Sequence, residues 1–232
     1  GGIGKTTLAR LAFNHKNVER AFDYRVWVYV SMKFDLKKVG ESIISEIEGG
    51  GCSYATLQDV IRHLERVLAG KKFLVVLDDL WEENGCRLEI LKAMLKVGAK
   101  GSKVIVTTRS EKVARLMGPG PPGISYELGV LSDDDCWILF EQRAFLHGRR
   151  DPRLEEIGRD IVKKCKGVPL SAISLGFVMR FKEGVAAWAA MRDSEIWEME
   201  EDQNILPSLK LSYYNLPPHL RLCFAYCALF PE

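Results

Sequence analysis

The sequence predicts an α/β domain over residues 1–130, followed by an all-helical region over residues 131–232. In the first half, short apolar runs rich in β-branched and aromatic residues alternate with helical patterns. That alternation is typical of a parallel sheet whose strands are joined by helices. Polar residues come directly after two of the apolar runs. Beyond about residue 131, helical patterns succeed one another and none of the segments is typical of a strand.

The elements of the first half follow from their apolar patterns. Residues 5–13 predict a helix that leaves a glycine-rich loop. Residues 55–69 predict an amphipathic helix, because leucine and isoleucine recur on one face. The continuous apolar run 73–77 predicts a strand buried on both faces. The remaining predicted elements are strands over 25–30 and 104–106 and a helix over 88–95.

The second half begins with a helix start. Ser132 is followed by three aspartates, and a capping serine with an acidic first turn is typical of a helix N-terminus. Breaks between the predicted helices fall at 148–151, 166–169, 182–184 and 216–218.

Composition and charge favour an ordinary globular protein. The chain of 232 residues has 47% hydrophobic and 28% charged residues, which argues against disorder. Its 33 Lys and Arg against 31 Asp and Glu leave a formal charge of +2, so we expect no direct nucleic-acid partner. No apolar run approaches the ~20 residues of a transmembrane helix. Because the first residue is glycine and not methionine, we expect a fragment of a longer protein.

The six cysteines predict reduced thiols. They are scattered, none forms a C-x-x-C pair, and the four histidines show no metal-ligand spacing. A zinc site is the less favoured alternative.

The opening residues carry a phosphate-binding motif. They read GGIGKTT, which matches the end of the P-loop pattern G-x-x-x-x-G-K-[ST]. Glycines let backbone N–H groups approach phosphate oxygens, Lys5 can reach the β- and γ-phosphates, and the Thr6 hydroxyl can bind Mg²⁺. The strand that should precede the loop would lie before Gly1, so we expect a P-loop sheet with its first strand missing. Alone, the motif is also compatible with a chance glycine turn.

Two carboxylates, Asp78 and Asp79, directly follow the apolar run 73–77. Ligands of parallel sheets bind at the carboxyl ends of strands, where one aspartate can hold Mg²⁺ and its neighbour can orient water. The alternative is that both only cap a turn or the next helix. The P-loop upstream favours the magnesium interpretation.

Arg109 follows a third run, KVIVTT, at the same predicted edge of the sheet. An arginine there can bind the γ-phosphate through two hydrogen bonds. The alternative is an ordinary surface arginine, and the other two motifs favour the phosphate sensor.

Together these motifs resemble the NB-ARC domain of plant disease-resistance proteins of the nucleotide-binding, leucine-rich-repeat type. The resemblance covers essentially the whole chain. It rests on six ordered segments: GGIGKTTLA, KKFLVVLDDLW, GSKVIVTTR, YELGVLSDDDCWILFEQRAF, CKGVPLSAISLG and CFAYCALFPE. In having Trp81 just after the two aspartates, the sequence resembles the coiled-coil class of these receptors and not the Toll-like class.

The resemblance implies a role for each matching residue. It implies phosphate binding by Gly2, Gly4, Lys5, Thr6 and Thr7, and Mg²⁺ binding by Thr6 and Asp78. It also implies a catalytic-type acid at Asp79, a γ-phosphate sensor at Arg109 and a contact of Pro169 with the nucleotide base. From the residues alone, the segment around Pro169 predicts only a helix end and restart.

The function that the resemblance implies is a molecular switch in a cytoplasmic plant immune receptor. ADP would hold the off state, ATP the on state, and hydrolysis would be slow. The parent protein would add a coiled coil and leucine-rich repeats that contact this module, and would self-associate on activation. A working P-loop ATPase, such as a motor or a nucleic-acid remodeller, is the alternative, because it would use the same residues. The intact Lys5, Thr6 and Asp78 argue against an inactive scaffold.

Overall fold

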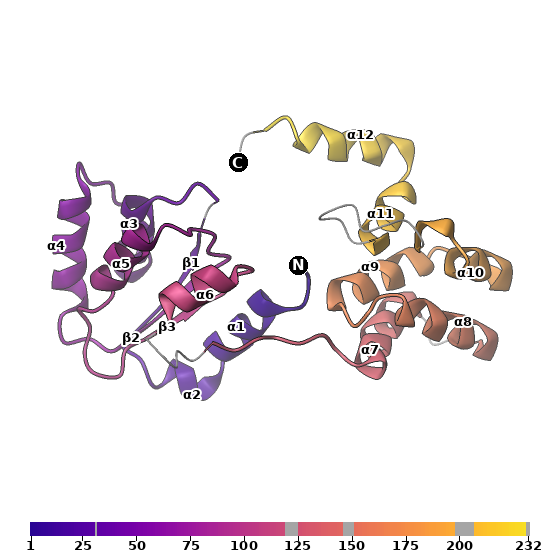
Figure 1. Ribbon diagram of the computed structural model, residues 1–232, viewed down its shortest axis with the longest axis horizontal. Coiled ribbons are helices and arrows are strands. Elements are labelled where there is room, and N and C mark those ends of the chain that lie inside the picture. The colour runs from indigo at the N-terminus through magenta and orange to yellow at the C-terminus, as the bar shows by residue number, and fades with distance from the viewer. Residues whose placement is uncertain (31, 119–124, 146–150, 198–206, 231–232) are drawn as a thin grey trace. The chain divides into compact units, whose positions relative to one another are not determined.

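The computed structural model describes residues 1–30, 32–118, 125–145, 151–197 and 207–230 (Figure 1). The chain divides into two compact units. One contains Lys5–Glu127, and the other contains Gly1–Gly4 together with Leu128–Glu232. Within the described residues, no helix has both the length and the apolar character needed to cross a membrane.

The unit Lys5–Glu127 is built on a parallel sheet. Its strands are β1 (Tyr24–Tyr29), β2 (Phe73–Asp78) and β3 (Lys103–Val106), in the spatial order β1-β2-β3. All six residues of β2 are buried, as expected for a central strand that is covered on both faces. The register pairs Tyr29 with Asp78 and Leu77 with Val106, so the carboxyl ends of the three strands meet at one edge. The predicted parallel α/β sheet is therefore confirmed.

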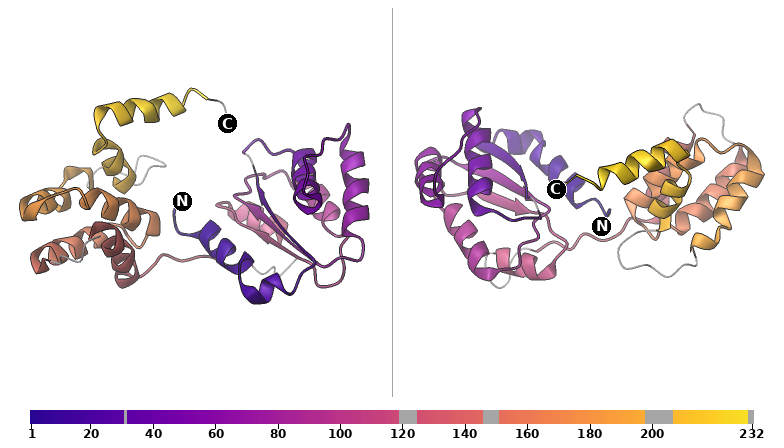
Figure 2. Two further views of the ribbon diagram at one scale, coloured as in Figure 1. Left: turned by 180° about the vertical axis from the view of Figure 1, so that it is seen from behind. Right: turned by 90° about the horizontal axis from the view of Figure 1, so that it is seen from above.

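Six helices accompany this sheet in the part of the unit that the structure describes. They are α1 (Lys5–Phe13), α2 (Lys16–Glu19), α3 (Leu36–Glu48), α4 (Leu57–Leu68), α5 (Gly85–Met94) and α6 (Glu111–Met117). Helices α3, α4 and α5 cover one face, where their apolar side chains share a core with Val26, Val75 and Leu77, and α1 lies on the other face (Figure 2). The sequence predicted α1, α4 and α5 but not α2, α3 or α6.

Strand β3 forms one edge of the sheet. Among the described residues it pairs only with β2, and the side chains of Lys103 and Val104 are exposed. The strand that the sequence led us to expect before Gly1 lies outside this chain and stays a prediction.

In the second unit, every regular element formed by the described residues is a helix, as predicted for residues 131–232. Its helices are α7 (Asp133–Ala144), α8 (Pro152–Lys163), α9 (Pro169–Met179), α10 (Gly184–Arg192), the 3₁₀ turn Glu195–Trp197, α11 (Pro207–Tyr214) and α12 (Pro218–Cys227). Ser132 caps α7 by accepting a hydrogen bond from the N–H of Asp135, at 3.1 Å. The expected break at 148–151 falls largely outside the described residues, and the other three lie between helices as predicted.

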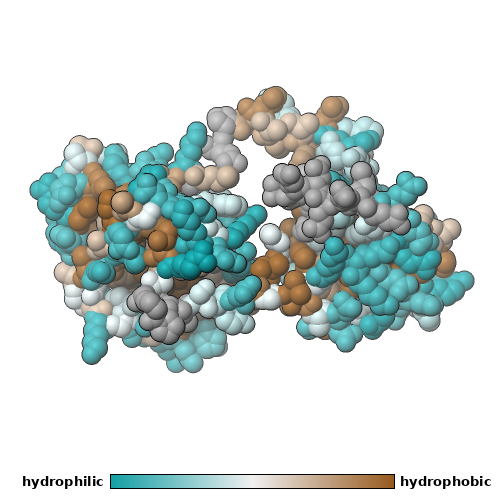
Figure 3. Space-filling view, viewed as in Figure 1, coloured by the Kyte–Doolittle hydropathy of each residue, from teal (hydrophilic) through white to brown (hydrophobic). Residues whose placement is uncertain are grey.

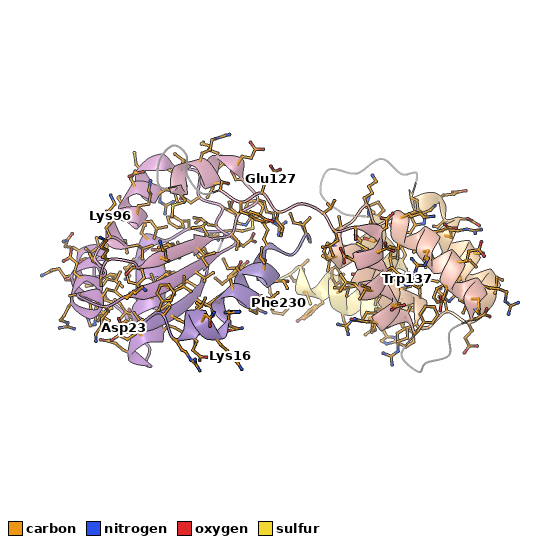
Figure 4. The ribbon with its side chains drawn as sticks, turned by 90° about the horizontal axis from the view of Figure 1, so that it is seen from below. Lys16, Asp23, Lys96, Glu127, Trp137 and Phe230 are labelled. Carbon is orange, nitrogen blue, oxygen red and sulfur yellow. The ribbon has the colours of Figure 1, made fainter. Side chains whose placement is uncertain are left out.

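Aromatic side chains fill the core of the helical unit. Trp137, which Figure 4 labels, stacks on Phe140 with 5.6 Å between ring centroids, and Phe140 meets Trp188 edge to face. Helix α12 differs from the others, because several of its large apolar side chains, including Leu222 and Phe224, are exposed (Figure 3).

Close contact between α7 and α9 depends on Gly176. A Cβ atom at this position would lie 2.5 Å from the carbonyl oxygen of Phe140 and 2.9 Å from Cβ of Arg143. Because the nearest neighbour is helix backbone, it cannot move aside as the end of a side chain could. The final glycine of the segment CKGVPLSAISLG is therefore explained by packing.

We predict that Gly176→Ala destabilises the helical unit. Alanine would gain about 0.8–1.0 kcal/mol of helix propensity, but the overlap with the Phe140 backbone should cost about 1–3 kcal/mol. Gly129→Ala is the matched control, because a Cβ atom there meets nothing within 4 Å. Urea denaturation followed by circular dichroism measures both. A Gly176→Ala protein as stable as the Gly129→Ala protein would contradict the packing argument.

Candidate functional site

The carboxylate of Asp78 is the centre of the candidate site. It stands at the last position of β2 and is only 4% exposed. Two hydroxyl groups donate hydrogen bonds to its Oδ1 atom: Oγ1 of Thr6 at 2.8 Å and Oγ1 of Thr107 at 2.6 Å. A buried charge needs such partners, since an unpaired one is costly. Asp78 thus connects the first turn of α1, the end of β2 and the residue after β3.

The backbone turns sharply at the next residue. Asp79 has φ of 59°, a left-handed conformation that is uncommon for residues other than glycine. Its N–H donates to Oγ1 of Thr107 at 2.9 Å, and the N–H of Leu80 donates to the carbonyl oxygen of Thr107 at the same distance. Leu80 is fully buried in the core under the sheet. The turn therefore separates the side chain of Asp79 from that of Asp78.

Asp79 faces Arg109. Nε of Arg109 lies 3.5 Å from Oδ1 of Asp79, and the two side chains are 49% and 23% exposed. The Arg109 guanidinium also lies over the ring of Trp81, 5.2 Å from its centroid. A partly exposed ion pair of this kind contributes at most about 1 kcal/mol, so an anion that offers better hydrogen bonds can displace it.

Lys5 occupies the first turn of α1. Burial, and then the positive charge of Arg109, lower the pKa of its ammonium group from the ordinary value, and Asp79 offsets part of this effect. The charged form of Lys5 is therefore under-stabilised, which favours the binding of an anion beside it.

The loop before Lys5 has the backbone that the motif predicts. Gly2 has φ of 75° and Gly4 has φ of 99°, conformations that side chains other than hydrogen rarely allow. A Cβ atom at Gly4 would meet nothing within 4 Å, so the backbone there is open to a ligand. The first N–H groups of any helix lack acceptors within the helix, and in α1 these belong to Lys5, Thr6 and the exposed Thr7. Free N–H groups at the start of a helix are the donors that phosphate oxygens accept from most readily, which makes the first turn of α1 a candidate for phosphate binding.

Pro169 is described with the helical unit. It is the first residue of α9, and the N–H of Leu170 beside it donates to the carbonyl oxygen of Gly2 at 3.2 Å. A Cβ atom at Gly2 would lie 2.8 Å from that of Leu170. The start of α9 therefore contacts Gly2 of the glycine-rich loop. Both segments belong to the unit that contains Gly1–Gly4 and Leu128–Glu232.

The donor set fits Mg²⁺. Two oxygen atoms, Oγ1 of Thr6 and Oδ1 of Asp78, already lie within 2.8 Å of one another, and hard oxygen donors are the ligands that this ion prefers. The structure thus brings together Thr6, Asp78 and, at the same edge, Asp79 with Arg109.

Sequence reasoning missed Thr107, whose hydroxyl group bonds the carboxylate of Asp78. The alternation of side chains along β3 shows only that Thr107 and Thr108 point to opposite sides, and the pairing of β3 with β2 decides that Thr107 is the one that faces Asp78.

Comparison with known proteins places this chain in a family. The NB-ARC domain family matches residues 1–149. The chain belongs to the NB-ARC family. The predicted resemblance is therefore confirmed, and the P-loop fold and the parallel sheet agree with it.

Curated relatives of this NB-ARC chain match along its whole length. It is 46% identical over 234 residues to the putative disease resistance protein RGA1 and 48% identical over 238 residues to the disease resistance protein RGA2, both from Solanum bulbocastanum. It is 41% identical over 239 residues to the putative disease resistance RPP13-like protein 1 of Arabidopsis thaliana. The NB-ARC chain spans 24%, 24% and 22% of the lengths of these three proteins.

The lowered pKa of Lys5 gives a prediction. Its neutral amine, the form that reacts with acetic anhydride, should appear at a lower pH than an ordinary lysine amine requires, because burial and Arg109 disfavour the charge. Bound ADP should reverse this, since phosphate charge stabilises the ammonium group and covers it. Mass spectrometry of Lys5 acetylation against pH measures both effects.

Arg109→Gln is the informative variant, because it removes the neighbouring cation and should move the reactivity of Lys5 back toward higher pH. If Lys5 titrates like an ordinary lysine in the parent, and neither ADP nor the variant changes its reactivity, the assigned environment is wrong.

Proposed function

We propose that this chain is an ATP- and ADP-binding molecular switch that uses Mg²⁺. The observation that carries the proposal is the 2.8 Å hydrogen bond between the hydroxyl of Thr6 and the carboxylate of Asp78. It joins the phosphate-binding loop to the strand-end acid, which is the pairing that a P-loop site needs to hold a metal ion against phosphates. Thr6 and Asp78 would hold Mg²⁺, which would neutralise phosphate charge.

The phosphates themselves would be bound by the loop. The backbone of Gly2 and Gly4, the N–H groups of Thr6 and Thr7 and the ammonium group of Lys5 would contact them. The left-handed glycines and the under-stabilised charge of Lys5 support this assignment. Membership of the NB-ARC family supports nucleotide binding in the same way.

The difference between ADP and ATP would be detected by Arg109. A ligand shifts a conformational equilibrium only if it binds the two states differently. With ADP, Arg109 would remain paired with Asp79 and in contact with Trp81, at the 3.5 Å and 5.2 Å that the structure records. The γ-phosphate of ATP would attract Arg109 away from Asp79. The released carboxylate would then accept a hydrogen bond from the attacking water and orient it, which makes Asp79 the catalytic carboxylate of a slow hydrolysis.

The names of the relatives support a biological setting. They are called disease resistance proteins, and we propose that this chain is the switch of a cytoplasmic plant immune receptor of the coiled-coil class. Residues 1–130 would bind the phosphates, and the helical subdomain 131–232 would contact the nucleotide base through Pro169. Coiled-coil and leucine-rich-repeat domains and self-association on activation would belong to the parent protein.

The test is the nucleotide that the purified protein carries and the rate at which it turns over. We expect ADP to be released when the protein is denatured, and multiple-turnover ATP hydrolysis to be slow. Lys5→Ala should weaken ADP binding on the order of a hundredfold, because it removes a charge that pairs with phosphate. Lys96→Ala, at an exposed lysine that Figure 4 labels, should bind like the parent.

Fast and sustained hydrolysis would favour the alternative, a working ATPase such as a motor or a nucleic-acid remodeller. A folded protein that binds neither nucleotide would reject both proposals.

A further inference from the structure

Thr107 contacts four consecutive residues at the end of β2. Its N–H donates to the carbonyl oxygen of Leu77 at 3.0 Å, and its carbonyl oxygen accepts from the N–H of Leu80 at 2.9 Å. Between these two, its hydroxyl bonds the carboxylate of Asp78 and the N–H of Asp79. The residue is 7% exposed, so water does not readily replace these bonds.

The orientation of the Thr107 hydroxyl is fixed by its two partners. A hydroxyl has one proton to donate, and the Asp78 carboxylate can only accept, so the proton of Thr107 points to Oδ1 of Asp78. A lone pair of the same oxygen accepts from the N–H of Asp79. The hydroxyl oxygen of Thr107 therefore holds both the side chain of Asp78 and the backbone of Asp79.

The backbone of Asp79 needs this support. Its φ of 59° is a sparsely populated conformation for a residue with a side chain, and such conformations persist only where the surroundings hold them. Without the Thr107 hydroxyl, the buried carboxylate of Asp78 would lose one of its two donors, and the N–H of Asp79 would lose its acceptor.

We propose that Thr107 is the positioning residue that directs the two carboxylates to different tasks. Through its hydroxyl it aims Asp78 at the metal position beside Thr6, and it holds the turn that presents Asp79 to Arg109. Thr107 acts through these two residues and does not itself contact the nucleotide. This inference rests on the proposed function, because Mg²⁺ binding is the task that Asp78 is positioned for.

The neighbouring threonine provides a matched control. Oγ1 of Thr108 accepts a hydrogen bond at 3.0 Å from the N–H of Ser110, the residue that caps α6. Among the described contacts, Thr108 bonds neither the carboxylate of Asp78 nor that of Asp79. Thr107→Val and Thr108→Val therefore remove the same atom from adjacent residues. Thr107→Ser keeps the hydroxyl, and Thr107→Cys keeps only a weak donor.

The experiment measures the affinity of the ADP-loaded chain for Mg²⁺ by titration, and ADP affinity with Mg²⁺ and in EDTA. Thr107→Val should bind Mg²⁺ about 10- to 100-fold more weakly, as expected when the hydrogen-bond partner of a metal ligand is lost. Its ADP affinity in EDTA should match that of the parent. Thr107→Ser and Thr108→Val should resemble the parent, and Thr107→Cys should lie between. A thermal melt checks folding, and if Thr107→Val does not fold, Thr107→Cys decides.

A second readout needs no ligand. Amide hydrogen exchange of residues 78–80 should be faster in Thr107→Val than in Thr108→Val, because the N–H of Asp79 has lost its acceptor.

The inference would be overturned if the Thr107→Val protein bound Mg²⁺ with the affinity of the parent. It would also be overturned if Thr107→Val lost the same amount of ADP affinity with Mg²⁺ as in EDTA, because equal losses indicate a merely structural role. If the parent itself shows no Mg²⁺-dependent ADP binding, the proposed function fails. Hydrogen exchange then still decides whether Thr107 holds the turn.

Discussion

A single buried carboxylate determines how the sheet domain must be assembled. Asp78 is almost fully buried and accepts hydrogen bonds from hydroxyl groups that lie 72 residues before it and 29 residues after it in the chain. An unpaired charge in that place would cost several kcal/mol, so the first turn of α1 and the end of β3 must both reach it. The parallel order β1-β2-β3 allows this, since it brings the carboxyl ends of the strands to one edge. Fold and candidate chemistry thus depend on the same contact.

The same edge separates two acids that are adjacent in sequence. Asp78 is buried and held by two hydroxyls, whereas the side chain of Asp79 is 23% exposed and faces Arg109. The left-handed backbone of Asp79 produces this difference, and Leu80, fully buried beyond it, anchors the turn. Adjacent carboxylates directed the same way would repel one another. The left-handed backbone of Asp79 keeps the two side chains apart, as the proposed division of their roles requires.

Much of this arrangement could be predicted from the sequence, and the remainder has physical reasons. The run 73–77 is apolar throughout, so β2 was predictable within a residue. Helix α3 was missed because Gly40 interrupts its pattern and three glycines follow it. Gly40 is there because a side chain would overlap Val60 of α4. The role of Thr107 was missed because two threonines precede Arg109, and only the pairing of β3 with β2 decides which of them faces Asp78. The left-handed conformation of Asp79 likewise depends on contacts distant in sequence.

The most direct measurement is the magnesium dependence of ADP affinity in the parent, Asp78→Ala and Asp79→Ala proteins, obtained by isothermal titration with Mg²⁺ and with EDTA. Asp78 is assigned as a metal ligand and Asp79 as a water-orienting acid. Mg²⁺ should therefore strengthen ADP binding in the parent and in Asp79→Ala, and should lose most of its effect in Asp78→Ala. Equal magnesium dependence in all three folded proteins would contradict the assignment and leave the two aspartates as structural caps of the strand.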